Sequence, residues 1–291
     1  MTAATITAPA VTEPSAAAEP APGTRNRWQL RAGAAASLVV LFAVCLRLAG
    51  QVPVMSDGAA NAMQAWDMLH GNVLLRGWTL TDLSFYTTEL PEYMITEQLR
   101  GLGPGAAHLA AALTYTLLVA GVVLLARGRA TGRAGIIRGL LAAGVMITPL
   151  GFSDTTVLAD PDHVGTQVPL VLAWLILDRA RSGWRPVAAV TAILAWCQVA
   201  DPLVTYEGVL AIVIVCGIRL YQRQARRYEL ALAAGAICST AVAAVALRAI
   251  RHAGGFVLTP LDTTFTAVAT LASHLFVTVQ GVLTMYGADF S

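Results

Sequence analysis

Long runs of hydrophobic residues, separated by short polar connections, dominate the chain. The runs cover residues 30–50, 106–126, 136–152, 164–177, 186–200, 203–218, 230–247 and 265–285. A helix needs about 20 apolar residues to cross the hydrocarbon core of a bilayer. The pattern therefore predicts an all-α, polytopic bundle of transmembrane helices with about 7–8 spans. The last run is more polar than the others, and it either forms an additional span or lies on the membrane surface.

Polar segments divide the chain into a tail and a helical domain. Residues 1–29 are rich in Ala, Pro and Thr, and we expect them to form a disordered tail. The transmembrane helical domain then covers residues 30–291. Its first apolar run is longer than the core of a signal peptide, and no A-x-A cleavage motif follows it, so we expect a retained first span. Residues 51–105 form the first outer loop, with a helix inside it.

Arginine placement predicts which side of the membrane each connection occupies. The arginines of the tail and of alternate connections are Arg25, Arg27, Arg31, Arg127, Arg129, Arg133, Arg138, Arg179, Arg181, Arg185, Arg219, Arg223, Arg226 and Arg227. Because short cytoplasmic loops carry the excess of basic residues, we expect a cell-membrane protein with a cytoplasmic N-terminus. The loop 51–105, the connection 153–163, the turn at Asp201 and the segment after Arg248 then lie on the outer side.

The composition agrees with a protein whose main partner is the lipid bilayer. Hydrophobic residues make up 56% of the chain and charged residues only 12%, with a mean hydropathy of +0.65. These values exclude a soluble globular protein and a disordered chain. The net charge of +2 gives no basic surface of the size that nucleic-acid binding requires. The four cysteines lie in or beside apolar runs, which is typical of small buried side chains.

The first outer loop contains the strongest catalytic candidate. Its segment SDGAANAMQAWDMLH predicts a short helix with Ser56 as N-cap, ended by Gly71. Asp57 then lies in the first turn, where the helix N-terminus favours an ionised carboxylate. Such a carboxylate at the membrane surface can act as a general base or as a metal ligand. Alternatively, Asp57 only stabilises the start of the helix.

The connection FSDTTVLADPDHVGTQ places two carboxylates and an imidazole within four residues: Asp160, Asp162 and His163. This cluster can contact the substrate, and with Asp57 its Asp162 can bind a divalent metal cation. The alternative is a turn directed by Pro161 in which Asp162 caps the next helix.

Other polar residues on the outer side are weaker substrate-binding candidates. Glu89 and Glu92 lie in TTELPEY, which we interpret as an extended loop. Arg248 and Arg251, with His252, form a small basic group that can receive a lipid phosphate, or that anchors the helix end at the interface by snorkelling. Glu207 lies within an apolar run, so it either faces a site or has a polar partner nearby.

The passage SDGAANAMQAWDMLHGN…LLRGW resembles the first outer loop of the GT-C superfamily of membrane glycosyltransferases. The resemblance extends over residues 30–290, and FSDTTVLADPDHVGTQ is similar to the loop before the fourth span in the same superfamily. It implies that Asp57 is the catalytic base and that the sugar donor is a polyprenyl-phosphate sugar. Many members carry a second acid directly after the first, but Gly58 stands there in this chain.

The resemblance implies a glycosyltransferase that transfers a sugar from a polyprenyl-phosphate donor to an acceptor on the extracytoplasmic face. Superfamily members are generally longer, so one alternative is an inactive, truncated relative. The other is a non-catalytic multi-pass membrane protein, such as a transporter or a scaffold subunit. A transporter is less favoured because the sequence has no clear internal repeat.

Overall fold

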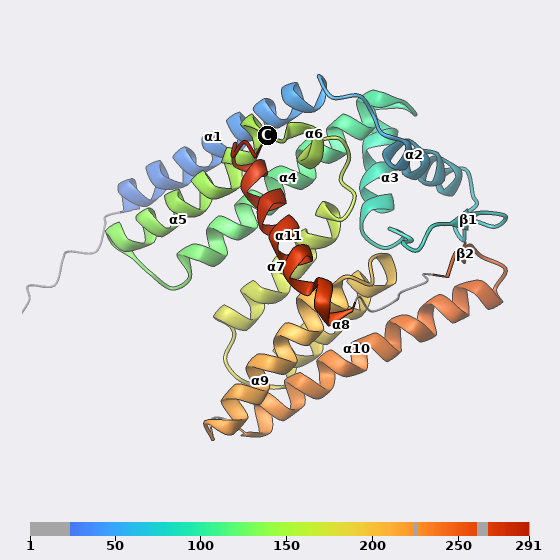
Figure 1. Ribbon diagram of the computed structural model, residues 1–291. Helices are drawn as coiled ribbons and strands as arrows, with labels where there is room; N and C mark the ends of the chain where they lie inside the picture. Colours follow the sequence, from blue (N-terminus) through green and yellow to red (C-terminus); the bar gives the residue numbers. More distant parts are fainter. Residues whose placement is uncertain (1–23, 224–225, 261–266, 291) are drawn as a thin grey trace, which may run out of the picture. The chain divides into compact units, whose positions relative to one another are not determined.

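A computed structural model describes residues 24–223, 226–260 and 267–290 (Figure 1). The tail that the sequence predicts to be disordered lies mostly outside these residues. The chain divides into two compact units at Ser37, which lies within the first helix. The second unit begins at Leu38 and contains all the later helices and strands.

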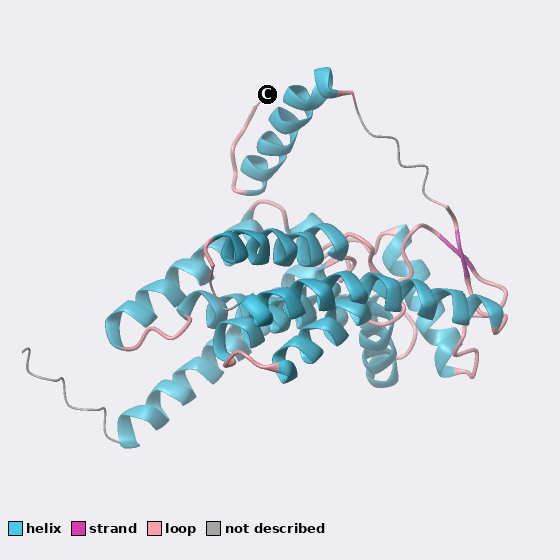
Figure 2. Cartoon of the chain, turned by 90° about the horizontal axis from the view of Figure 1, so that it is seen from below, coloured by secondary structure: helices cyan, strands magenta, loops and turns pink. Residues whose placement is uncertain are grey.

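The described residues are almost entirely α-helical, which confirms the predicted fold class (Figure 2). The elements are α1 (Thr24–Ala49), α2 (Ser56–Leu69), β1 (Thr79–Leu80), α3 (Glu89–Arg100), α4 (Pro104–Arg127), α5 (Gly132–Ile147), the 3₁₀ turn η1 (Thr148–Gly151), α6 (Asp154–Val157), α7 (Val164–Arg179), α8 (Trp184–Ala200), the π-helical turn η2 (Thr205–Leu210), α9 (Ala211–Tyr221), α10 (Arg226–His252), β2 (Val257–Leu258), η3 (Val268–Thr270) and α11 (Leu271–Met285).

Within the described residues, five helical stretches are long and apolar enough to cross a membrane. They are Arg31–Ala49, Pro104–Arg127, Gly132–Gly151, Arg226–His252 and Val268–Met285. Helices α7 and α8 contain 16 and 17 residues, which correspond to about 24–26 Å of length. That is less than the hydrocarbon core of about 30 Å, so the count of 7–8 spans remains a prediction.

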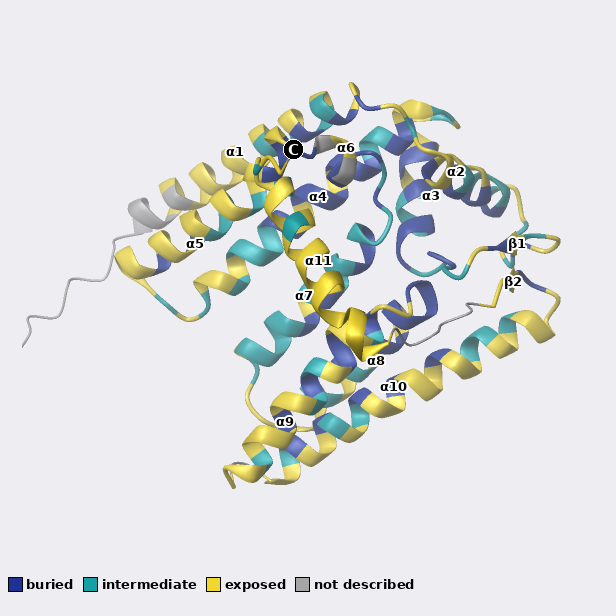
Figure 3. Cartoon of the chain, in the orientation of Figure 1, coloured by how far each residue is buried: buried dark blue, intermediate teal, exposed yellow. Residues whose placement is uncertain are grey.

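The exposed surfaces of the long helices are apolar, as expected for a membrane-embedded protein. In Figure 3, α11 is exposed along almost its whole length, and none of the residues in its apolar window is buried. Leu140 and Leu141 of α5 are 67% and 66% exposed. In a soluble protein, a contiguous exposed apolar surface of this kind marks an interaction surface. In a membrane, the same surface contacts lipid acyl chains and needs no protein partner.

Two buried clusters hold the helices that position the polar residues. One joins α2, α3 and α4 and is built from Ala62, Ala65, Met68, Leu90, Tyr93, Ala107 and Ala110, among others. The second joins α7, α8, α9 and α10 and includes Leu170, Ala173, Val190, Leu194, Ile212, Leu232 and Ala236. The outer loop therefore has its own apolar core, next to the start of α4.

Backbone pairing brings the predicted outer segments together. Strand β1, in the first outer loop, pairs in parallel with β2, which follows α10, in the register Thr79↔Val257 and Leu80↔Leu258. Ser84 Oγ donates to the Val199 carbonyl at 2.6 Å, and the Ser84 N–H donates to the Ala200 carbonyl at 3.1 Å. The loop therefore contacts both the end of α8 and the segment after α10, which the arginine pattern places on the same side.

Candidate functional site

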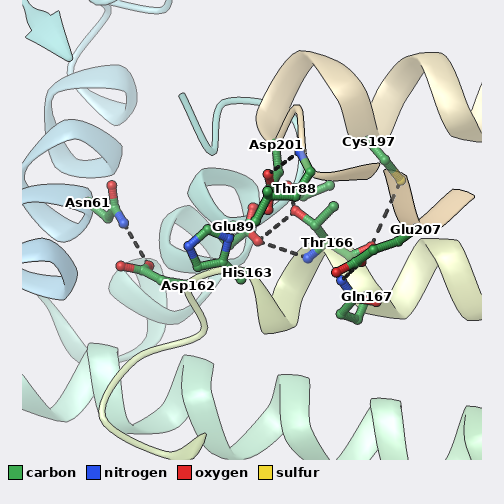
Figure 4. A network of polar contacts seen from close by, with 11 residues as sticks. Asn61, Thr88, Glu89, Asp162, His163, Thr166, Gln167, Cys197, Asp201 and Glu207 are labelled. Carbon is green, nitrogen blue, oxygen red and sulfur yellow. Dashed lines mark hydrogen bonds and ion pairs between the residues drawn. The ribbon is translucent and has the colours of Figure 1, made fainter. Parts of the chain in front are cut away.

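The predicted site residues of the two outer loops meet where α2 and α3 contact the segment before α7. Figure 4 shows this region with the polar contacts that join it. Asn61, one helical turn after Asp57 on α2, donates its amide N–H to Asp162 Oδ1 at 2.7 Å. Residues four apart in a helix share a face, so Asp57 and Asn61 both lie on the face of α2 that meets Asp162.

Helix α2 forms as its sequence predicts, with one difference at its start. It begins at Ser56, and Gly71 adopts φ +103°, a left-handed conformation suited to glycine just beyond the helix end. Ser56 does not cap the helix as expected: its hydroxyl donates to Asp57 Oδ1 at 3.3 Å. The exposed Asp57 carboxylate therefore has one weak local partner and a free second oxygen among the described contacts.

Gly58 leaves room for the Asp160 side chain. A Cβ added at Gly58 would lie 2.8 Å from Asp160 Cβ, 3.1 Å from Asp160 Oδ2 and 3.2 Å from the Tyr93 hydroxyl oxygen. The Asp160 carboxylate thus lies where a side chain at position 58 would begin. The acid that the resemblance expects directly after Asp57 is absent from the sequence, but the fold places an acid from another segment at that point.

We expect Gly58→Ala to displace Asp160 and to lower the free energy of unfolding by about 1–3 kcal/mol, as overpacking usually does. Alanine is the better helix former, so a loss of stability would come from the close contacts with Asp160 and the Tyr93 hydroxyl. Gly144→Ala is the matched control, because a Cβ at that helical glycine meets no heavy atom within 4 Å. Equal denaturant midpoints for the two variants would contradict this account.

Burial and nearby carboxylates raise the pKa of both aspartates of this loop. Burial, together with the nearby Asp160 carboxylate, raises the pKa of Asp162 to about 8, although the Asn61 hydrogen bond opposes the rise. Burial also raises the pKa of Asp160, and the charge of Asp57 adds to that effect. The expectation that Asp162 caps α7 is wrong, since its described hydrogen bond comes from Asn61 and α7 has no side-chain cap.

His163 is held in a strained and polar position just before α7. Its backbone adopts φ +62°, which is uncommon for a residue with a side chain. Its Nδ1 lies 2.7 Å from Asp201 Oδ2, and its ring packs edge-on against Phe85 with centroids 5.4 Å apart. The hydrogen bond with Asp201 raises the pKa of the imidazole. Asp201 also accepts the Leu203 N–H at 2.8 Å, which confirms the tight turn predicted there.

Asp201→Asn is expected to lower the pKa of His163 towards or below its ordinary value, because the hydrogen bond with the carboxylate is the largest cause of the increase. NMR titration of the ring signals measures this pKa, and His163→Gln assigns the signal among the five histidines. Asp82→Asn serves as the control, since no described contact joins Asp82 to the ring. An unchanged His163 pKa in Asp201→Asn would show that the 2.7 Å contact does not persist in solution.

Glu89 and Glu92 do not lie on an extended loop, as the sequence analysis expected, but in the first turn of α3. Glu89 is fully buried and accepts hydrogen bonds from the Thr166 N–H and hydroxyl, both at 2.8 Å, and from the Thr88 hydroxyl. Glu92 accepts one from the Thr114 hydroxyl. Burial raises the pKa of each carboxyl to about 7. Glu89 therefore links α3 to α7 through these hydrogen bonds.

Tyr93, on α3, places a buried hydroxyl next to the two aspartates. Its side chain is fully buried, and its hydroxyl has no hydrogen-bond partner among the described residues. Burial raises the pKa of this phenol well above its usual value, and Asp162 and Asp160 add to the effect. An unsatisfied buried hydroxyl costs free energy, and this one lies next to Gly58 and close to Asp160.

The remaining candidates lie outside this cluster. Arg248 and Arg251 are exposed on the last turns of α10, and no hydrogen bond or ion pair of the described residues joins them to the acids. Glu207 is exposed in η2 and accepts the Gln167 amide N–H at 2.6 Å, so it has a partner. No group of three or more metal-binding side chains occurs in the described part, and the cation site of Asp57 and Asp162 stays a prediction.

Comparison with protein-family models, with curated proteins and with solved structures finds no match.

Proposed function

We propose that the chain is a membrane glycosyltransferase that transfers a sugar from a polyprenyl-phosphate donor to an acceptor on the extracytoplasmic face. The observation that carries the proposal is the convergence of Asp57, Asp160 and Asp162 from two loops that lie about a hundred residues apart in the sequence. Inverting glycosyl transfer needs a base opposite the leaving group. A cluster of acids with different environments meets that need.

The environments of the three acids suggest different roles. Asp57 is exposed and acts as the base that takes the proton of the acceptor hydroxyl as the hydroxyl oxygen attacks the anomeric carbon. Burial raises the pKa of Asp162 to about 8, so near neutral pH this group is mostly protonated and donates a hydrogen bond to a sugar oxygen. The Asp160 carboxylate and the Tyr93 hydroxyl both lie next to Gly58 and orient the acceptor.

The leaving group in this reaction is a lipid phosphate. Arg248 and Arg251 are proposed to contact it, because β2, which follows them closely, is paired with the first outer loop. His163 carries a positive charge when it is protonated, so it is a second group that can attract the donor phosphate. Its ring is held by the contact with Asp201.

A divalent cation fits the acid cluster. In addition to burial, the Asp57 carboxylate raises the pKa of Asp160, and both of these carboxylates raise the pKa of Asp162, as expected for like charges that lie close together. A cation relieves such repulsion. Asp57 and Asp162 would hold the cation, which would neutralise charge on the donor phosphate. In that arrangement Asp162 would be ionised and would contact the cation instead of donating a hydrogen bond to the sugar, and the second oxygen of Asp57 would be the base.

The direct test is an assay of the purified chain in lipid with a panel of labelled polyprenyl-phosphate sugars. Transfer of label to an acceptor, or its release to water, supports the proposal. A scaffold or transporter would leave the donor intact, and an inactive relative would bind the donor without consuming it. An intact donor across the whole panel would therefore overturn the proposed activity.

A second experiment tests the arrangement on which the proposal depends. Single cysteines at positions 57 and 223 are labelled from one side of sealed vesicles, in a background where the exposed Cys238 is replaced by alanine. We expect an impermeant reagent to label the two positions from opposite sides. Labelling of both from the same side would exclude an outer site at Asp57.

A further inference from the structure

A hollow lined by both polar and apolar residues lies at the opposite end of α7 from Asp162. It has a volume of about 400 Å³ and lies between the C-terminal turns of α7 and α9 and the first turns of α10. Its lining includes Trp174, Asp178, Arg219, Tyr228 and Glu229. The arginine-rich connections meet at this end, and the proposed glycosyl transfer uses none of these residues.

Two carboxylate oxygens in this lining lack hydrogen-bond donors. Glu229 is only 3% exposed, and Arg219 Nη1 lies 3.3 Å from its Oε1, but Oε2 has no partner among the described residues. Asp178 Oδ2 is buried and likewise has none. The nearby Arg129 does not satisfy it, because its guanidinium donates to the Asp178 carbonyl at 2.8 Å. Buried acceptors without donors are costly, so the hollow lacks a group that donates hydrogen bonds.

The lining also indicates the charge of that missing group. Arg219 pairs with Glu229, whereas no ion pair of the described residues involves the Asp178 carboxylate, so Asp178 lacks a cationic partner. The aromatic rings of Trp174 and Tyr228 attract a cation by their negative faces. A primary ammonium has a positive charge and three donors, and it meets both requirements. A quaternary ammonium has the charge but no donor.

An apolar hollow of about 530 Å³ adjoins this site. The two share Ser182 and Tyr228, and the second is lined by the first turns of α8 and α10, with Arg227 and the 75% exposed Trp184 at its edge. Helix α10 is long and apolar enough to span a membrane, so its first turns lie near the headgroup region. Exposed Trp residues are favoured at that depth.

We propose that these two hollows bind one phospholipid with a primary ammonium headgroup, phosphatidylethanolamine. Its ammonium lies between Asp178 and Glu229, and its phosphodiester contacts Arg219 or Arg227 by charge-assisted hydrogen bonds. The part of an acyl chain next to the headgroup packs against Val187 and Ala231 in the apolar hollow. An anionic headgroup without an amine leaves both carboxylates unsatisfied, and a choline headgroup gives them no hydrogen-bond donor.

Lipid selection by the purified full chain tests this site. The protein is incorporated in nanodiscs with equal amounts of phosphatidylethanolamine, phosphatidylcholine and phosphatidylglycerol, and the lipids that stay bound after transfer to detergent are identified by native mass spectrometry. We expect phosphatidylethanolamine to be enriched about tenfold over each of the others, the effect of about one charge-assisted hydrogen bond. Retention in bilayer proportions, or a preference for either other lipid, would overturn the proposal.

Single substitutions test whether the enrichment of phosphatidylethanolamine depends on the residues that line the hollow. Asp178→Asn, whose side chain is partly exposed, and Tyr228→Leu should each remove most of the enrichment, and Glu229→Gln should do so as well. Glu207→Gln, which alters an exposed carboxylate outside both hollows, should retain it. If Glu229→Gln does not fold because Arg219 loses its partner, the other two variants decide. Full enrichment in both Asp178→Asn and Tyr228→Leu would show that the lipid binds elsewhere.

Discussion

Replacement of Asp57 by Asn is expected to slow sugar transfer by a factor of about 10²–10⁴, the usual contribution of a general base. An amide cannot accept the proton of the acceptor hydroxyl, whereas its size and its weak contact with the Ser56 hydroxyl are retained. The donor should therefore bind as before, and the loss should appear in kcat. Initial rates with a labelled polyprenyl-phosphate sugar, together with donor binding measured separately, separate the two effects.

The matched control for this prediction is Asp82→Asn. Asp82 lies in the same outer loop, but no described contact joins it to the acid cluster, so transfer should remain within about twofold of the wild type, as expected for a substitution away from the reacting groups. A rate for Asp57→Asn close to that of Asp82→Asn would show that Asp57 is not the base. Asp160, whose carboxylate lies beside Gly58, would then be the nearest alternative.

The helices were predictable because each has a local cause. The apolar runs give the long helices, and the outer-loop helix α2 follows from its periodic apolar residues and from Gly71 at its end. Helix α3 was missed because TTELPEY is polar and contains Pro91. Yet proline is tolerated in the first turn of a helix, and Glu89 and Glu92 are the acids that a helix N-terminus favours. That combination is a helix-start signal that the polar composition obscured.

The contacts that assemble the site were not predictable, because they join residues far apart in the chain. Arginine placement predicted that the loops share a side, and the acids of those loops were identified as candidates. Nothing in a single sequence pairs Asn61 with Asp162 or His163 with Asp201. The position of Gly58 is instructive, since its lack of a side chain has a meaning only once Asp160 is placed against it.

Replacement of Glu89 by Ala is expected to lower the free energy of unfolding by about 3–5 kcal/mol. The substitution leaves the buried Thr166 N–H and hydroxyl without their acceptor, and each such loss costs about 1–3 kcal/mol. It also leaves a void next to Gly165, whose added Cβ would lie 2.7 Å from Glu89 Cγ. Denaturant titration in mild detergent measures the change. Glu89→Gln retains a carbonyl acceptor and should lose much less.

The same residue makes stability depend on pH. The pKa of Glu89 is raised from 4.5 to about 7 by burial, so between these values the unfolded chain ionises while the folded chain keeps its proton. Stability is then highest below pH 4.5 and falls as pH rises towards 7, by about 3 kcal/mol from this group, at 1.36 kcal/mol per pKa unit.

Glu89→Gln isolates that contribution, because glutamine does not titrate. Its stability should fall less steeply than that of the wild type between pH 4.5 and 7. The remaining slope should come from the other acids with a raised pKa, among them Asp162, at about 8, and Glu92 and Glu97, at about 7. Identical slopes in the two proteins would mean that Glu89 is ionised in the folded state. The contact between α3 and α7 would then be an ionised carboxylate held by Thr88 and Thr166, and its charge would help to raise the pKa of Asp162.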